Sequence, residues 1–199
     1  MAETLRVEAF VLGKALKTKQ WEYKLLVLNK GAVLAYTYAK KGQNPAALDI
    51  FDHCDCVLEP FASDSLYSLK DVDLIRHYGG IGRRYESLLY ASRLASLLWG
   101  NAELLDGSEP FFQLFLKAFE ALELSPFPEL IYLKFLYKWL KLEGYPVKEQ
   151  WLSSYVEAPE SLKRVLFSEP KELDRPSVKQ WIGSLQSWMQ QHTPLNTDL

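Results

Sequence analysis

The chain of 199 residues has an ordinary globular composition, with 48% hydrophobic residues, 24% charged residues and a formal net charge of −2. This composition excludes wholesale disorder and a long coiled coil, and the length suits two small domains. The sequence contains no apolar run of about 18 residues and no basic-then-apolar leader, so we expect a cytoplasmic protein without membrane contact.

Four N-terminal segments show the two-residue period of half-buried strands, at residues 5–12, 21–28, 33–38 and roughly 52–58. The tripeptide Asn29-Lys30-Gly31 predicts a hairpin with a bulge between the second and third strands. We expect these strands to make most of an antiparallel barrel of about five strands, the size of an OB-fold.

The period of the apolar residues becomes helical after residue 65. Helices are predicted at 85–99 and 111–124, from Pro128 to a stop at Gly144, and from about Asp174 onward. The last helix should pack on the others through a stripe formed by Val178, Trp181, Ile182, Leu185, Trp188 and Met189. The predicted fold is α+β, an N-terminal OB-fold β-barrel (residues 1–64) followed by an α-helical domain (residues 65–199).

The two cysteines of the chain, Cys54 and Cys56, lie two residues apart on a predicted strand. This spacing disfavours a disulfide between them, and we interpret both as small apolar core residues with Asp55 facing outward. The alternative is a metal site completed by His53, but a second ligand pair at zinc spacing is missing. We therefore expect no metal and no cofactor.

Motifs of common enzyme chemistry are missing from the sequence, including the nucleophile elbow, the phosphate loop and the paired-histidine zinc helix. We expect a protein that is not an enzyme, with an unrecognised polar pocket as the alternative. Gly79, Gly80 and Gly82 could cradle a phosphate or act as a hinge, and the lack of a predicted strand before them favours the hinge.

Charge is polarised at the start of the chain. Residues 1–48 hold eight basic and three acidic residues, whereas residues 49–64 hold five acidic residues and no lysine or arginine. Single-stranded nucleic acids are bound by lysines at the phosphates and by aromatic rings that stack on bases. This region offers Lys14, Lys17, Lys19, Trp21, Tyr23, Lys24, Lys30, Tyr36, Tyr38, Lys40 and Lys41. The alternative is that about half of the aromatic residues face the barrel core.

Three segments carry a family resemblance: EAFVLGKALKTKQWEYKLLVLNKGAVLAYTYAKKGQ near the start, FFQLFLKAFEALELSPFPELIYLKFLYKWLKLEGYPV in the helical half, and WIGSLQSWMQQHTPLNT near the end. These segments resemble the RecO family of DNA-repair proteins. The first resembles the opening strands of that family, the second its paired helices with a Leu-x-Gly-Tyr type stop, and the third its last helix and short tail. Together they cover most of the chain.

The resemblance implies a recombination mediator that binds single-stranded DNA, anneals strands, contacts the tail of single-strand binding protein and works with RecR to load RecA. By position, the DNA-facing candidates are Lys14, Lys17 and Lys19 in the first loop, Lys30 at the turn, and Lys40 and Lys41 after the third strand, with Trp21 and Lys24 between them. Candidates for the acidic, Phe-ended tail are Lys134, Phe135 and Lys138, with Arg93 as a weaker one. A solvated helix face is the alternative for these lysines.

Two features depart from the family. Residues 146–176 contain no cysteine, where many relatives carry a four-cysteine zinc site, and the chain is shorter than is typical and slightly acidic. An adaptor that acts mainly through partners fits these departures better than a strong DNA binder. The rival hypothesis is a protein-interaction scaffold with an OB-like barrel and no nucleic-acid role.

Overall fold

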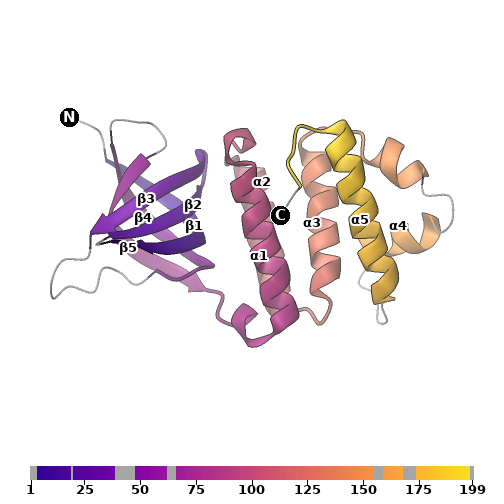
Figure 1. Cartoon of the computed structure of the whole chain (residues 1–199), viewed down its shortest axis with the longest axis horizontal. Helices are drawn as coiled ribbons and strands as arrows, with labels where there is room; N and C mark the ends of the chain where they lie inside the picture. The colour runs from indigo at the N-terminus through magenta and orange to yellow at the C-terminus, as the bar shows by residue number, and fades with distance from the viewer. Residues whose placement is uncertain are drawn as a thin grey trace. The chain divides into compact units, whose positions relative to one another are not determined.

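The computed structural model of the chain describes residues 4–18, 20–38, 48–61, 66–154, 159–167 and 174–197. Its regular elements (Figure 1) are β1 (Leu5–Lys17), β2 (Gln20–Val27), β3 (Gly31–Tyr38), β4 (Asp52–Pro60), β5 (Leu66–His77), the short helix η1 (Ile81–Arg83), α1 (Tyr85–Gly100), η2 (Ala102–Leu104), α2 (Glu109–Leu124), α3 (Pro128–Leu142), the π-helical turn η3 (Lys148–Leu152), α4 (Pro159–Phe167) and α5 (Arg175–His192).

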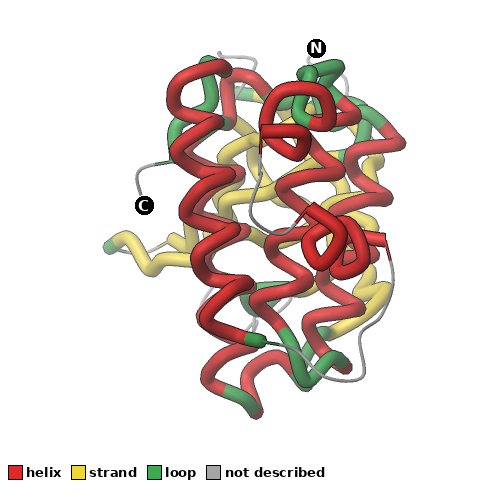
Figure 2. Tube along the Cα trace, turned by 90° about the vertical axis from the view of Figure 1, so that its right-hand side faces the viewer, coloured by secondary structure: helices red, strands yellow, loops and turns green. Residues whose placement is uncertain are grey.

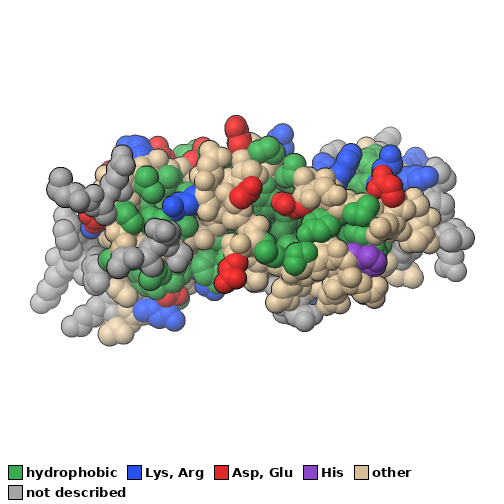
Figure 3. Space-filling view, turned by 90° about the horizontal axis from the view of Figure 1, so that it is seen from above, with side chains coloured by type: hydrophobic (Ala, Val, Ile, Leu, Met, Phe, Trp, Pro, Cys, Tyr) green, Lys and Arg blue, Asp and Glu red, His purple; other side chains and the backbone are tan. Residues whose placement is uncertain are grey.

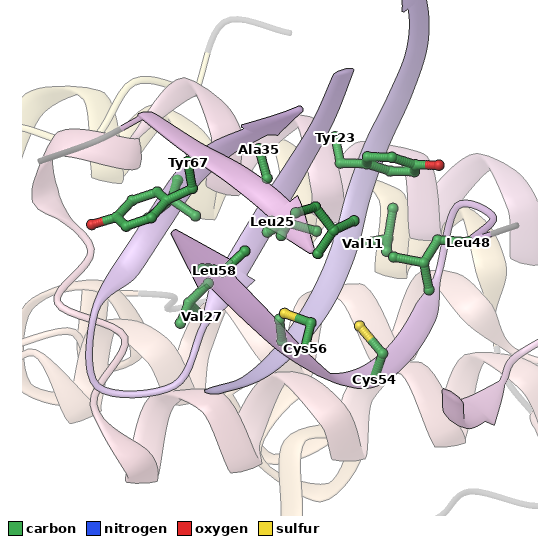
Figure 4. Close-up of a cluster of buried hydrophobic side chains, with 13 residues drawn as sticks. Val11, Tyr23, Leu25, Val27, Ala35, Leu48, Cys54, Cys56, Leu58 and Tyr67 are labelled. Carbon is green, nitrogen blue, oxygen red and sulfur yellow. The ribbon is translucent and has the colours of Figure 1, made fainter. Parts of the chain in front are cut away.

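The five strands form a closed barrel in the order β1-β2-β3-β5-β4. Neighbouring strands are antiparallel, except that β3 and β5 form a short parallel pair. Alternate strand side chains point inward and, with Leu48, make a buried hydrophobic core (Figure 4) that includes Val11, Tyr23, Leu25, Val27, Ala35, Cys54, Cys56, Leu58 and Tyr67. The predicted α+β fold, an OB-like barrel followed by helices, is confirmed.

The predicted hairpin between the second and third strands is also confirmed, and a close backbone contact covers it. Asn29 and Gly31 take positive φ angles of 58° and 84° at the turn. The N–H of Asn29 donates to the carbonyl oxygen of Gly107 at 2.7 Å. A Cβ atom on Gly31 would lie 1.9 Å from the carbonyl oxygen of Leu105, so only glycine fits there.

The strand β5 lies in the segment that the sequence assigns to the α-helical domain, ahead of the first predicted helix at 85–99. Its inward side chains, Tyr67, Leu69 and Val72, do not keep a strict two-residue period. The pairing of β4 with β5 shifts register between His53 and Cys54 and between Val57 and Leu58, and each irregularity changes which side chains face inward. Periodicity alone therefore missed the strand.

The chain divides into two compact units that differ from the predicted division at residues 64 and 65. The barrel unit comprises Met1–Gly79 and Ala95–Phe112, and the helical unit comprises Gly80–Leu94 and Gln113–Leu199. The fifth strand places the end of the barrel at His77, and the later half of α1 with the loop around Gly107 packs with the barrel unit. Continuous helices thus contribute to both units.

Every described regular element of the helical unit is a helix, as the secondary-structure colouring of Figure 2 makes clear. All six residues of the predicted stripe on α5 are buried, which confirms the stripe. The predicted start and stop of α3 are also confirmed. Pro128 lies in its first turn, and Gly144, beyond its last residue, takes a φ of +79°.

Candidate nucleic-acid interface

The β1–β2 hairpin is longer than the sequence predicts. Lys14 and Lys17 lie in β1 and not in a loop, because β1 stays paired with β2 as far as Lys17, which is opposite Gln20. The pairing shifts register between Val11 and Gly13, and Thr18, which follows β1, takes a φ of +52°. Thr18 is not a residue that favours such a turn, so the sequence did not predict it.

The residues near this turn combine apolar, aromatic and basic side chains, which we call the hairpin cluster: Lys14, Leu16, Lys17 and Trp21. Leu16 and Trp21 face each other across the two strands. Leu16 keeps 60% of its surface exposed, Lys17 is exposed and Trp21 is half-buried against the barrel core. An exposed leucine this large beside a partly exposed indole is a surface on which a flat apolar group can pack.

Lys14 holds the indole of Trp21 in place. Its Nζ lies 4.6 Å from the centre of the Trp21 ring and donates a hydrogen bond to the carbonyl oxygen of Leu48 at 2.6 Å. One ammonium group thus joins the hairpin to the chain segment that enters β4. The hydrogen bond to Leu48 and the ring contact give Lys14 a role in positioning Trp21, and its predicted contact with phosphate stays a prediction.

Two other predicted lysines also lie over aromatic rings of the barrel unit. The Nζ of Lys24 is 4.8 Å from the centre of the Trp99 ring, and the Nζ of Lys30 is 5.1 Å from that of Tyr67. Trp99 belongs to α1 and Tyr67 to the barrel core. Both lysines cover aromatic surface, which is a structural role independent of any ligand.

The predicted DNA-facing lysines do not gather in one place. Lys17 and Lys30 adjoin opposite ends of β2, whose eight residues span roughly 25 Å. Lys19, Lys40 and Lys41 lie outside the described residues. On the face of the molecule shown in Figure 3, the lysine and arginine side chains form several small separate groups. Of the predicted site, the structure brings together Lys14 and Trp21. Lys17 follows Leu16 in an extended strand, so its side chain lies on the other face of the hairpin.

The candidates for binding an acidic tail are divided between the core and the surface of the helical unit. Phe135 is buried, with its ring packed against Phe115 and Trp139, so it stabilises the core and is not at the surface. Lys138 on the same helix is exposed and Lys134 is half-buried. Arg93 is exposed, with its guanidinium 5.4 Å from the centre of the Tyr90 ring.

An ion-pair network on the barrel was missed by sequence reasoning. Arg6 donates hydrogen bonds to Asp55 at 3.0 Å and to Asp73 at 2.6 Å, and these bonds raise the pKa of its guanidinium. Lys70 pairs with Glu59 at 2.5 Å. The network joins β1, β4 and β5, so it depends on their registers, which no local sequence pattern reveals.

One N–H group of the glycine segment after β5 is engaged by a carboxylate of the chain itself. The N–H of Gly80 already donates to the carboxylate of Glu123 at 2.9 Å. The guanidinium of Arg84 donates to the carbonyl oxygens of Ser125 at 2.6 Å, and of Leu122 and Glu123 at 3.0 Å each. Arg84 thereby satisfies the C-terminal carbonyls of α2, where a helix favours positive charge.

The interpretation of the cysteines as core residues is confirmed. Cys54 and Cys56 are buried, and their sulfur atoms point into the barrel (Figure 4). The pKa of the Cys54 thiol is raised, mainly by a hydrogen bond with Cys56 and to a smaller extent by burial. The Nε2 atom of His53 lies 2.7 Å from a carboxylate oxygen of Glu8. Among the described residues, no group of three or more histidine, cysteine or acidic side chains could hold a metal ion.

No family model matches this chain, and no curated protein matches it either. Within the described part of the chain, no helix is long and apolar enough to cross a membrane.

Proposed function

We propose that this chain is a DNA-repair and recombination adaptor of the RecO type. In this proposal the barrel unit binds single-stranded DNA and the helical unit contacts the tail of single-strand binding protein and RecR, so that the adaptor promotes annealing and helps to load RecA. The observation that carries the proposal is the hairpin cluster on an OB-like barrel. The loop between the first two strands is one of the regions through which OB-folds bind oligonucleotides.

The cluster offers each group that a single strand needs. The indole of Trp21 supplies a flat surface for a base, and Leu16 extends that surface. Lys17 is exposed on the other face of β1, where it can contact a phosphate of a strand that passes around the end of the hairpin. Lys14 fixes the indole from the barrel side through its hydrogen bond to Leu48. A platform that is already ordered loses less entropy when a base stacks on it.

The partner role of the helical unit is supported by charge rather than by a formed pocket. Lys138 presents an exposed ammonium group on α3, and Arg93 presents a guanidinium on α1. Either cation could pair with an acidic peptide. Since Phe135 is buried, the apolar part of such a peptide would have to contact other side chains.

The DNA role is tested by titrating a labelled single-stranded oligonucleotide and following fluorescence anisotropy. Lys17→Glu should weaken binding by about tenfold, because it removes a phosphate contact and adds repulsion. Lys179→Glu makes the same charge change at an exposed position of α5 and should leave the affinity unchanged. If Lys17→Glu and Lys179→Glu bind as tightly as the unaltered chain, the hairpin cluster is not the DNA site.

Trp21→Phe tests base stacking without a large loss of stability, because the smaller ring still packs against the barrel core. Trp21→Ala would remove that packing as well. We expect Trp21→Phe to bind about three- to tenfold more weakly, since stacking contributes roughly 1–3 kcal/mol per base and a smaller ring retains part of it. If the unaltered chain binds no oligonucleotide at low salt, the scaffold hypothesis replaces the adaptor.

A further inference from the structure

The helical unit contains a carboxylate that is buried without hydrogen bonds. Glu129, in the first turn of α3, keeps 1% of its surface exposed, and neither of its carboxylate oxygens accepts a hydrogen bond. The N-terminal end of a helix favours a negative charge, which offsets part of the cost of burial. The rest of the cost is large, because a carboxylate removed from water stays ionised only beside a compensating charge. Glu129 therefore needs a cation close by.

The first residue of α5, Arg175, supplies that cation. Its Nε lies 3.3 Å from Oε1 of Glu129, and among the described residues it is the one basic side chain that forms an ion pair with this carboxylate. A positive charge at the start of a helix is unfavourable for the helix itself, since that end already carries a partial positive charge. Arg175 thus contributes between helices and not within α5.

The same guanidinium also binds α1 and the loop before α3. Its Nη1 donates to both carboxylate oxygens of Glu86, each at 2.7 Å, and its Nη2 donates to the carbonyl oxygen of Pro126 at 3.1 Å. The guanidinium lies 5.9 Å from the centre of the Phe127 ring. One side chain therefore joins the start of α5 to α1, to α3 and to the loop that precedes α3.

The two ion pairs of Arg175 differ in their surroundings. The side chains of Arg175 and Glu86 are 40% and 51% exposed, so water and salt screen their attraction. The side chain of Glu129 is 2% exposed, and water does not replace a lost partner there. Removing one member of a buried pair costs much more than removing an exposed pair. The longer contact, with Glu129, is therefore the one that holds α5.

The other charged and titratable groups beside this pair leave Glu129 dependent on Arg175. Burial and then the charge of Glu129 raise the pKa of the Tyr90 phenol, so that this neighbour is neutral at neutral pH. Arg93 lies with its guanidinium 5.4 Å from the centre of the Tyr90 ring. Glu86 is itself an acid and adds to the local negative charge. None of these groups takes the place of Arg175.

We propose that Arg175 and Glu129 form a charge-controlled latch for α5. This helix packs beside α3 (Figure 1) and buries its apolar stripe from Val178 to Met189. While the guanidinium neutralises the buried carboxylate, the start of α5 stays on α3. Once the guanidinium is lost, the first turns of α5 move away so that water reaches Glu129, and the apolar stripe becomes exposed. The latch thereby controls access to that surface. The proposal does not depend on DNA binding.

Amide hydrogen exchange of the full chain, followed residue by residue, tests the latch. In Arg175→Gln, amides between Val178 and Leu185 should exchange at least about tenfold faster than in the unaltered chain, whereas amides of β2 should keep their rates. Equal acceleration throughout the helical unit would overturn the proposal, because Arg175 would then stabilise the unit as a whole. Unchanged exchange in α5 would overturn it as well.

A second substitution tests whether the charge of Glu129 drives the opening. Methionine has about the length of glutamate and carries no charge, so Arg175→Gln combined with Glu129→Met needs no cation at this place. This double variant should exchange in α5 at least about fivefold more slowly than Arg175→Gln alone. A double variant that opens as readily as Arg175→Gln would contradict the latch. If Arg175→Gln does not fold, a folded double variant supports the proposal and an unfolded one contradicts it.

The matched control is Glu86→Gln, which removes the exposed ion pair and leaves Glu129 its cation. Exchange in α5 should change by less than about threefold in this variant, since exposed pairs contribute little. If Glu86→Gln opens α5 as much as Arg175→Gln does, the exposed pair holds the helix and the latch is wrong.

Discussion

At the scale of single residues, two glycines allow a close contact between two backbone segments. Gly31 and Gly107 have positive φ angles of 84° and 66° and lie against each other's backbone. A Cβ on Gly107 would lie 2.3 Å from the nitrogen of Gly31. The pair lets the loop around Gly107 lie directly on the β2–β3 turn. The tripeptide signal predicted the turn, but nothing local to Gly107 predicted its contact with Gly31.

Replacing Gly31 by alanine should destabilise the chain strongly. The new methyl group would overlap the carbonyl oxygen of Leu105, and the φ of +84° is unfavourable for alanine. We expect a loss of roughly 3 kcal/mol or more in the free energy of unfolding, measured by urea denaturation. Gly82→Ala is the control, because no atom lies within 4 Å of a Cβ there. Equal stability of the two variants would show that the turn does not need this contact.

Tyr132 should make the stability of the chain sensitive to alkaline pH. Burial raises the pKa of its phenol to about 12, from 10.0 in the unfolded chain. The neutral phenol is favoured in the folded state, so this contribution is complete below about pH 10 and is lost as the pH rises toward about 12.

The variant Tyr132→Phe cannot ionise at this position. Between about pH 8 and pH 11, its free energy of unfolding should fall by roughly 1.4 kcal/mol less than that of the unaltered chain. Urea denaturation at both pH values measures the difference, and the other tyrosines affect both proteins alike. Identical losses in the two proteins would mean that Tyr132 ionises without cost in the folded state.

At the scale of elements, sequence patterns predicted the parts that obey one regular period. The strands around Leu25 and Val33 and the helices that begin at Pro128 and Arg175 follow from apolar spacing and from proline and glycine at their ends. The patterns failed where pairing between distant segments overrides the local period. The irregular β5 and the extension of β1 to Lys17 are both of this kind.

The end of α2 should depend on Arg84. Arg84→Gln removes most of the donors that satisfy three carbonyl oxygens at that end. We expect a loss of about 1–3 kcal/mol in the free energy of unfolding, because charged donors to backbone carbonyls contribute in that range. Arg83→Gln, which removes the neighbouring exposed guanidinium, should change the stability by less than about 0.5 kcal/mol. Thermal or urea denaturation of both variants would decide this, and comparable losses would contradict the assignment to Arg84.

At the scale of the whole molecule, the candidate site could be predicted only in part. Counting basic residues along the chain identified the first 48 residues as the positive segment. It could not show that Lys14 and Lys24 lie over indole rings. In the folded chain Lys14, Lys24 and Lys30 lie over aromatic rings, whereas Lys17 is exposed to a ligand.

The salt dependence of DNA binding tests the central claim most directly. Each phosphate contact to a single strand contributes a slope of about −0.7 to a plot of log affinity against log salt concentration. A site with few free lysines should give a slope between about −1 and −3, and Lys17→Glu should make that slope shallower by roughly 0.7. A slope near zero, or one that Lys17→Glu leaves unchanged, would contradict the claim that the hairpin cluster binds single-stranded DNA.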